Sequence, residues 1–313
     1  MFGSKLVNVE EYLNEIEHNL KSSKINFDVC THKANKIYDF IKYFIAKRYA
    51  EIHVIKLGHL RNAEQHLHSF VVNCYDKKIN EATNDFNLIK AELMRFASFG
   101  EVYLLRHADK PKADRKSMGF EMSELGVKQA KHVAEMIEEE ILLVPKPVVI
   151  KVHCSEQKRT AVLGRVMKFL NNAHKIGKKD ITIMGPTEDQ RLFMGNFSDD
   201  AMKFLTEHLK NEGEVKTYLE WVKAEQGVFG DLIKSGKLQH PKISESSIHN
   251  FVATEQQETF DSNHYTIIIG VSHSWTIDVW LMHYTGIQEI ISTAEYAKVE
   301  RGSLYYKGKW FRI

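Results

Sequence analysis

Residues 100–108 read GEVYLLRHA, a short apolar run that follows a glycine and ends in an arginine and a histidine. A run of this length, bounded by a breaker and by charged residues, is typical of a strand that is buried on both faces. In open α/β sheets the ligand lies at the carboxyl ends of the strands. Arg106 and His107 therefore occupy a position where a functional site is expected.

Three comparable runs follow along the chain, at residues 148–153, 181–184 and 266–271. Stretches with apolar residues at helical spacing separate them, at residues 123–138, 160–172 and 201–210. Ser123 is placed to cap the first of these helices, and residues 303–306 and 310–313 predict a closing hairpin around Gly308. The alternation predicts an α/β domain over residues 99–313, a three-layer sandwich with a central, mostly parallel sheet flanked by helices.

The chain before residue 99 has a different pattern. Its apolar residues fall at helical spacing in four stretches, the first of which begins at Asn8, with Glu11 placed as in a capping box. The region contains no proline. Each apolar stripe must be buried against another, so residues 1–98 are predicted to form an all-helical region, either a bundle or a long helical hairpin.

Composition and charge place the chain among soluble globular proteins. Of its 313 residues, 43% are hydrophobic and 27% are charged, and the formal net charge of +2 gives no reason to expect a nucleic acid or a membrane as partner. Cys30, Cys74 and Cys154 form no C-x-x-C pair, which argues against a disulfide framework or a thiolate zinc site. No segment resembles a signal peptide or a membrane span, so a cytoplasmic location is expected.

Basic and imidazole side chains follow three of the four predicted strands. Arg106 and His107 end the first, Arg159 lies shortly after the second, and His273 comes just after the fourth. Two arginines and two histidines suit a dianionic phosphate, because a guanidinium offers its oxygens a planar fork of donors and a histidine can attack or donate.

Four segments carry a resemblance to a known family. Residues 106–108, Arg-His-Ala, resemble an R-H-G signature at the end of a first strand, and residues 122–130 resemble the helix start L-T-x-x-G-x-x-Q-A. Residues 155–161 resemble the turn S-P-x-x-R-A-x-x-T, and residues 268–274 resemble the strand V-x-V-x-H-G. By their order and spacing the chain resembles the histidine phosphatase superfamily, also called the phosphoglycerate mutase-like fold, from about residue 100 to its end.

The resemblance implies a role for each strand-end residue. His107 would be the nucleophile that forms a phosphohistidine, while Arg106, Arg159 and His273 would hold the phosphoryl oxygens. It implies no metal and no cofactor. For attack His107 must present a neutral nitrogen, so we expect a backbone carbonyl to hold the other ring nitrogen.

The residue that protonates the leaving oxygen is harder to assign. One branch of the family places an acid directly after the second histidine, where this chain has Ser274, and Asp278 lies further along the next predicted helix. Another branch takes the acid from the segment after the third strand, which offers Glu188 and Asp189. We predict Glu188, with Asp189 or no acid as the alternatives. An enzyme without an acid would favour substrates with good leaving groups, because general acid help is typically worth about 100 to 10,000-fold.

The predicted function is a phosphomonoesterase acting on a phosphorylated small molecule or a phosphoprotein. The alternative is an inactive phosphate-binding or scaffolding module, which Ala108 in the signature favours. A phosphomutase is disfavoured by Ala113, since mutases often carry asparagine six residues after the nucleophile. A cysteine phosphatase built on Cys154 is disfavoured because four residues, not five, separate it from Arg159.

Two regions leave their roles open at this stage. Four alternative roles are considered for the N-terminal helices: forming a homodimer, docking a protein substrate, packing on the catalytic domain, or capping its active site. Residues 227–260 carry few signals and are interpreted as an insertion, which is where specificity is expected to reside.

Overall fold

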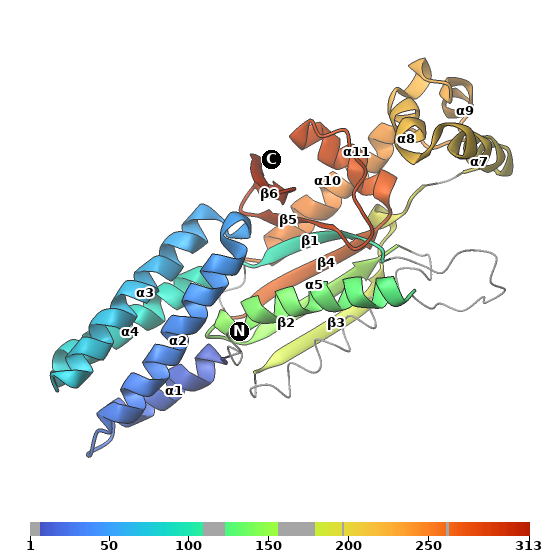
Figure 1. The fold of residues 1–313 in the computed structure, drawn as a ribbon. Coiled ribbons are helices and arrows are strands. Elements are labelled where there is room, and N and C mark those ends of the chain that lie inside the picture. The colour runs from blue at the N-terminus through green and yellow to red at the C-terminus, as the bar shows by residue number, and fades with distance from the viewer. Residues whose placement is uncertain (1–6, 109–122, 156–178, 196, 261–262) are drawn as a thin grey trace.

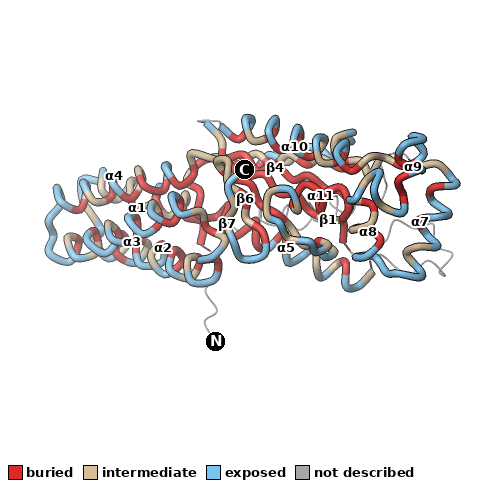
Figure 2. The backbone as a smooth tube through the Cα atoms, turned by 90° about the horizontal axis from the view of Figure 1, so that it is seen from above, coloured by how far each residue is buried: buried red, intermediate tan, exposed pale blue. Residues whose placement is uncertain are grey.

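The computed structural model describes residues 7–108, 123–155, 179–195, 197–260 and 263–313 (Figure 1). The molecule is elongated, with a helical bundle at one end, the sheet in the middle and a group of short helices at the other end (Figures 1 and 2). Arg159 and the helix predicted at residues 160–172 lie outside the described residues. No helix in the described part of the chain is both long and apolar enough to span a bilayer.

The N-terminal region is a bundle of helices, as one of the two predicted arrangements requires. Its members are α1 (Val9–Leu20), α2 (Phe27–Arg48), α3 (Val54–Tyr75) and α4 (Ile79–Phe96), with a short 3-10 turn at Tyr49–Glu51. Each helix packs on the next, and α1 also contacts α4. The predicted cap is present at the start of α1, where Asn8 Oδ1 accepts from the Glu11 N–H at 3.4 Å.

Among the described residues, seven strands form one sheet in the order β3-β2-β4-β1-β5-β6-β7. Their bounds are β1 Glu101–Arg106, β2 Val148–Cys154, β3 Ile181–Glu188, β4 Tyr265–Ser272, β5 Tyr296–Glu300, β6 Ser303–Tyr306 and β7 Lys309–Arg312. The pairings β1–β4, β2–β4 and β2–β3 are parallel, whereas β5, β6 and β7 add antiparallel pairings. The sheet is therefore mixed, with a parallel half that carries the strand ends identified in the sequence.

Helices cover both faces of the sheet, which confirms the predicted three-layer α/β sandwich. On one face lies α5 (Glu124–Leu143), packed on Tyr103 and Leu105 of β1. On the other lie α10 (Pro241–Glu258) and α11 (Ser274–Thr285), packed on Val102 and Leu104. Successive residues of a strand point to opposite faces, so a strand covered on both sides must be apolar throughout. Ser123 caps α5 as predicted, accepting from the Gly126 N–H at 3.0 Å.

The interpretation of residues 227–260 as an insertion is wrong for most of that stretch. Helix α10 is a layer of the sandwich, and Phe251 packs so closely on β4 that a Cβ at Gly270 would lie 2.6 Å from its ring. The added element is instead a group between β3 and α10. It consists of α7 (Asp199–Glu212), α8 (Glu214–Val222) and α9 (Gly230–Lys234), with 3-10 turns at Gln190–Leu192 and Ala224–Gln226.

Strand β5 was not predicted, because Lys298 and Glu300 interrupt its apolar pattern. Both side chains are nonetheless buried, since they join a cluster of charges at that point of the sheet.

The closing hairpin was predicted and is present. Its turn residues Lys307 and Gly308 both have positive φ, 46° and 79°, as a two-residue hairpin turn of the favoured type requires.

The helical bundle packs on the end of the sheet where β1 begins. One apolar core runs from the bundle into the face covered by α5. Within this contact Lys56 Nζ of α3 lies 2.8 Å from the Glu101 carboxylate and 3.2 Å from that of Glu140. The bundle therefore packs on the α/β region, and it does so at the opposite end of β1 from Arg106. Of the alternatives raised by the sequence, capping of the predicted active site does not fit this placement.

Candidate active site

Three residues come together at the carboxyl ends of β1, β2 and β4, at the end of the sheet nearest α7–α9 (Figure 1). His107, Ser155 and His273 are each the first residue beyond their strand. The ladder continues through them, because the His107 N–H donates to the Ser272 carbonyl and the Ser155 N–H to the Val271 carbonyl, both at 3.1 Å. The parallel register thus brings together His107 and His273, which were predicted as site residues, and Ser155, which was not.

The imidazole of His107 is held by its own backbone. His107 is 9% exposed, and its Nδ1 lies 3.0 Å from the Ala108 carbonyl oxygen. A carbonyl only accepts, so Nδ1 carries a proton, and in the neutral ring the lone pair is then on Nε2. This is the backbone anchor expected from the sequence, and it presents the tautomer that a nucleophilic histidine needs.

His273 lies against His107 and is buried with it. The two ring centroids are 5.4 Å apart, with the ring planes at 63°. Nε2 of His273 lies 3.0 Å from Ser155 Oγ, and both residues are less than 5% exposed. His273 also occupies the N-cap position of α11, without a capping hydrogen bond from its side chain. Two imidazoles, a hydroxyl and the positive end of a helix dipole together suit an anionic group.

The guanidinium of Arg106 is only partly occupied. Nη1 donates to the Ile291 carbonyl at 2.7 Å, and Nη2 donates to Glu214 at 3.2 Å. The buried Nε has no hydrogen-bond partner in the described part of the chain. Nε and Nη2 point the same way and form the fork that matches two oxygens of a phosphate. In the described structure Nη2 is bound to the Glu214 carboxylate, and the buried Nε is without a hydrogen-bond partner.

Glu214 is, besides Ser155, a residue at this site that sequence reasoning missed. It begins α8, and its Oε1 accepts from Arg106 and, at 3.4 Å, from the Ser274 hydroxyl. Ser274 follows His273 directly, at the position where an acid had been sought. Nothing local to residue 214 signals this role, since a glutamate in the first turn of a helix is common for its dipole interaction alone.

The predicted acids lie further from the two histidines. Glu188 is exposed at the end of β3, the edge strand, three strand spacings or about 14 Å from β1. Both carboxylate oxygens of Asp189 accept from Nε of Arg191. Burial raises the pKa of Asp189, but the hydrogen bonds from the Arg191 side chain and backbone outweigh it and leave that pKa below its usual value. Asp189 is therefore held in its ionised form.

Asp278, the remaining carboxylate considered from the sequence, is buried beneath the site. Its Oδ1 accepts from the Ile291 N–H at 2.8 Å, and Oδ2 has no partner among the described residues. Burial raises the pKa of Asp278 to about 8, although the bond from Ile291 and the nearby Arg106 oppose the shift. Asp278 is only 1% exposed, so it supports the loop that holds Arg106 and cannot itself reach a substrate.

The remaining predicted residues are placed only in part. Cys154 is buried as the last residue of β2, as expected for a structural strand-end cysteine. Arg159, the second phosphate-binding arginine of the resemblance, lies outside the described residues.

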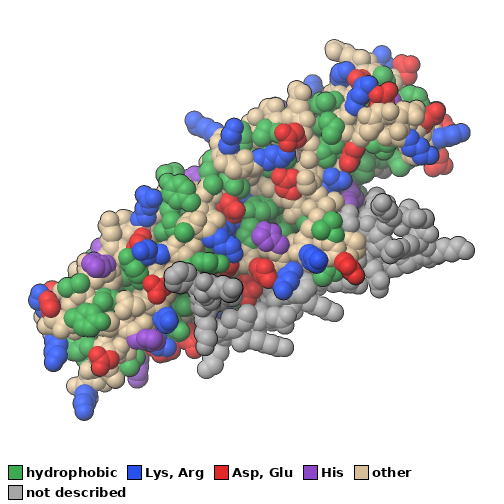
Figure 3. Space-filling view, viewed as in Figure 1, with side chains coloured by type: hydrophobic (Ala, Val, Ile, Leu, Met, Phe, Trp, Pro, Cys, Tyr) green, Lys and Arg blue, Asp and Glu red, His purple; other side chains and the backbone are tan. Residues whose placement is uncertain are grey.

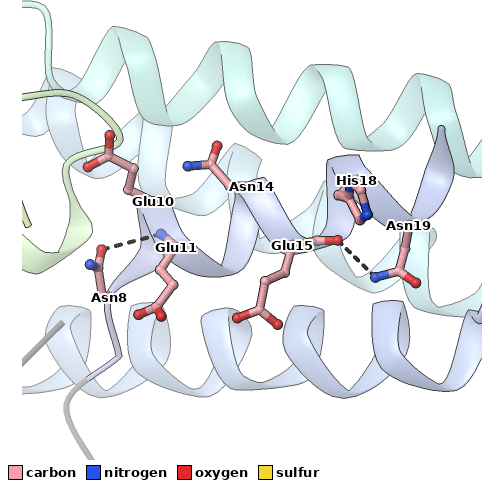
Figure 4. A pocket seen from close by; sticks show the side chains of 7 residues that line it. All are labelled: Asn8, Glu10, Glu11, Asn14, Glu15, His18 and Asn19. Carbon is pink, nitrogen blue, oxygen red and sulfur yellow. Dashed lines mark hydrogen bonds between the residues drawn. The ribbon is translucent and has the colours of Figure 1, made fainter. Parts of the chain in front are cut away.

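Charged side chains of both signs are mixed on the face seen in Figure 3, over its described residues. A surface pocket lies along α1, far from this site, and Figure 4 shows its lining: Asn8, Glu10, Glu11, Asn14, Glu15, His18 and Asn19. Its three carboxylates disfavour an anion, so it is no alternative phosphate site.

Comparison with known proteins gives structural neighbours only. No family model matches the chain, and no curated protein sequence matches it. A native mycobacterial glucosyl-3-phosphoglycerate phosphatase is 13% identical over 68% of this chain and 97% of its own, with a TM-score of 0.38. The same enzyme in complex with VO3 is 14% identical over 67% of this chain and 99% of its own, with a TM-score of 0.40. The product of a Mycobacterium tuberculosis open reading frame is 13% identical over 67% of this chain and 97% of its own, with a TM-score of 0.37. Identities and TM-scores this low assign neither a family nor an activity.

Proposed function

We propose that this chain is a phosphomonoesterase that works through a phosphohistidine on His107. The observation that carries the proposal is the fixed ring of His107, whose Nδ1–H donates to Ala108 and whose neighbour at 5.4 Å is His273. The half-open fork of Arg106, on the residue before, supports it. The resemblance in sequence adds Arg159 as a second guanidinium. The substrate is a phosphorylated small molecule or a phosphoprotein.

The reaction proceeds in two displacements at phosphorus. In the first, Nε2 of His107 forms the P–N bond while the P–O bond to the leaving group breaks, its electron pair going to the ester oxygen, which takes up a proton. In the second, water attacks phosphorus, the P–N bond breaks, and inorganic phosphate leaves. The Arg106 fork and His273 stabilise the charge on the non-transferring oxygens in both steps.

A phosphate-binding module without catalysis is the second candidate. Two observations favour it: Glu214 already occupies one donor of Arg106, and Ala108 stands where the R-H-G signature has glycine. Both candidates bind phosphate at the same residues, so only chemistry on His107 separates them.

The test is hydrolysis of p-nitrophenyl phosphate without added metal, with wild type, His107→Ala and the control His132→Ala, which removes an exposed histidine of α5. A parallel incubation with a 32P-labelled phosphodonor is quenched in base, which preserves phosphohistidine, and then treated with acid. We expect His107→Ala to lower the rate at least about 10,000-fold, as removal of a nucleophile does in other covalent enzymes. We expect acid-labile label on wild type and on His132→Ala only.

Three results would overturn the proposal. No turnover and no labelling, together with saturable binding of inorganic phosphate, would establish the binding module instead. Activity that survives in His107→Ala but is lost in Cys154→Ser would move the nucleophile to Cys154. Label that appears on wild type and equally on His107→Ala would place the phosphohistidine elsewhere.

A further inference from the structure

The helices inserted between β3 and α10 bring one carboxylate into the candidate site. Glu214 Oε1 lies 3.2 Å from Arg106 Nη2 and 3.4 Å from Ser274 Oγ. Its side chain is 47% exposed, whereas that of Arg106 is 16% exposed. Glu214 thus stands at the open side of the site, between the phosphate-binding fork and the solvent from which a substrate enters.

The position of Glu214 is set by packing. One face of α8 carries Trp221, which stacks on Trp275 of α11 with ring centroids 5.5 Å apart, and Tyr218, whose ring lies 6.0 Å from that of Trp275. The indole N–H of Trp221 donates to the Gln239 carbonyl at 2.9 Å. Trp275 is two residues from His273, so the helix that carries Glu214 is fixed to the helix whose N-cap position His273 occupies. A functional side chain on such a rigid support is held close to one geometry.

We infer that Glu214 is the general acid of this site and that the substrates are phosphate monoesters of alcohols, whose leaving oxygens need a proton. The inference rests on the proposed function. As the P–O bond breaks, the ester oxygen takes the bonding electron pair and the proton of Glu214, and an alcohol leaves. In the second step the ionised Glu214 takes a proton from the water that attacks phosphorus, which restores the acid and releases inorganic phosphate.

A bound phosphate would share a donor with Glu214. The Arg106 fork consists of Nε and Nη2, and Nη2 is the atom that Glu214 contacts at 3.2 Å. A phosphate on the fork therefore displaces the Glu214 carboxylate from Nη2 and leaves it beside the phosphoryl group. Asp278 of α11, whose pKa burial raises to about 8, interacts electrostatically with both Arg106 and Glu214.

The other described carboxylates considered for this role lack one of its requirements. Glu188 belongs to the edge strand, about 14 Å from β1. Asp189 is bound by Arg191, and Asp278 is buried without access to a leaving group. Glu214 alone among these four combines contact with Arg106 and exposure to the entering substrate.

The experiment compares leaving groups. Rates are measured for 2,4-dinitrophenyl phosphate, whose leaving group departs without a proton, and for glycerol phosphate, whose leaving group needs one. The variants are Glu214→Gln, Glu188→Gln and the matched control Glu212→Gln, an exposed glutamate at the end of α7. We expect Glu214→Gln to lower kcat/KM for glycerol phosphate at least about 100-fold, with a change below about fivefold for the dinitrophenyl ester. Glu188→Gln and Glu212→Gln should leave both rates close to wild type.

The outcomes separate this inference from the proposed function. Wild type that hydrolyses neither ester and carries no label on His107 fails the proposed function, and the acid role with it. An active wild type in which Glu214→Gln slows both esters alike, or neither, overturns the inference alone, and so does a leaving-group-dependent loss in Glu188→Gln. Should Glu214→Gln fail to fold, Glu214→Asp keeps the charge and withdraws the carboxyl by one methylene; the same selective loss on glycerol phosphate is expected of it.

Discussion

Strand β1 has a charged residue at each end, Glu101 at its start and Arg106 at its end, and the two differ in how completely their side chains are hydrogen-bonded. At its start, Glu101 is fully buried and its carboxylate accepts from Lys56 at 2.8 Å, Lys298 at 3.0 Å and the Tyr103 hydroxyl at 2.5 Å. At its end, Arg106 keeps a buried Nε without a partner among the described residues. Glu101 is thus hydrogen-bonded by the protein itself, although Glu300 of the same cluster has no hydrogen-bond partner for its carboxylate oxygens among the described residues. Arg106 keeps one donor without a partner there.

The difference has a physical cause. A charge removed from water must be compensated, and the helical bundle compensates Glu101 with Lys56 across the contact between the two regions. At the other end the side chain of Arg106 is 16% exposed and that of its partner Glu214 is 47% exposed. Charges at the start of β1 therefore hold the bundle against the sheet, whereas the charges at its end are those of the proposed phosphate site. Four predictions test this division.

The largest expected effect is on stability, at the start of β1. Lys56→Met should lower the free energy of unfolding by about 3–5 kcal/mol, because it leaves Glu101 and Glu140 buried beside an uncharged side chain. Urea unfolding at pH 7 measures it. Lys131→Met is the control, since Lys131 is 59% exposed and its ion-pair partner Glu135 is 53% exposed, and the loss of this pair should cost below about 1 kcal/mol. Equal losses in the two variants would contradict a structural role specific to the buried cluster.

At the end of β1 the expected loss is chemical. Arg106→Gln should lower hydrolysis of p-nitrophenyl phosphate about 100 to 1,000-fold, the usual effect of removing a donor to transition-state charge, and should change the free energy of unfolding by less than about 1.5 kcal/mol. Arg95→Gln, which removes a 60% exposed guanidinium of α4, serves as control and should leave activity unchanged. A large loss of stability with activity intact would show that Arg106 belongs with the structural charges.

Buried Asp278 gives a pH dependence of stability. Burial raises its pKa from 3.8 to about 8, so between these values the folded chain keeps a proton that the unfolded chain has lost. Its contribution is therefore fully present below pH 3.8 and is lost as the pH rises through 8, at up to about 1.4 kcal/mol per pH unit. Asp278→Asn should flatten this slope in urea unfolding from pH 5 to 8. Asp39→Asn, on the exposed side of α2, should leave it as in wild type; an unchanged slope in Asp278→Asn would refute the assignment.

The smallest effect is expected at Ser274. Its hydroxyl donates to Glu214 at 3.4 Å, a long bond, so Ser274→Ala should cost below about 1 kcal/mol in the orientation of that carboxylate. On glycerol phosphate this corresponds to a fall in kcat/KM of about fivefold or less. Ser235→Ala, which removes an exposed hydroxyl after α9, is the control. A loss as large as that expected for Glu214→Gln would make Ser274 itself part of the proton transfer.

Much of the fold could be predicted from the sequence, where one rule dominates each element. β1 and β4 are buried on both faces, which favours near-continuous apolar runs, whereas β2 alternates between buried and half-buried residues. The caps at Asn8 and Ser123 require specific side chains at specific positions. The carbonyl that holds His107 was also expected, because a nucleophilic imidazole needs a defined tautomer.

Other elements resisted prediction for equally physical reasons. β5 contains Lys298 and Glu300, which are buried only because partners from distant parts of the chain neutralise them. Helix α10 presents few apolar residues, so its place in the sandwich depends on the fit of Phe251 against Gly270. In both cases the deciding partner lies far along the chain, beyond any local pattern.

The sequence by itself determined the α/β class, the helical N-terminal region, the strand ends that carry Arg106, His107 and His273, and the hairpin that closes the chain. Only the tertiary structure decided which end of β1 is structural, where the helical bundle packs, and that Glu214 meets Arg106. Local patterns depend on burial and hydrogen bonding among residues a few positions apart, so they can be read from the sequence. Charge compensation is set by proximity in space, and only the packing of α3 on the sheet and of α8 on α11 creates it.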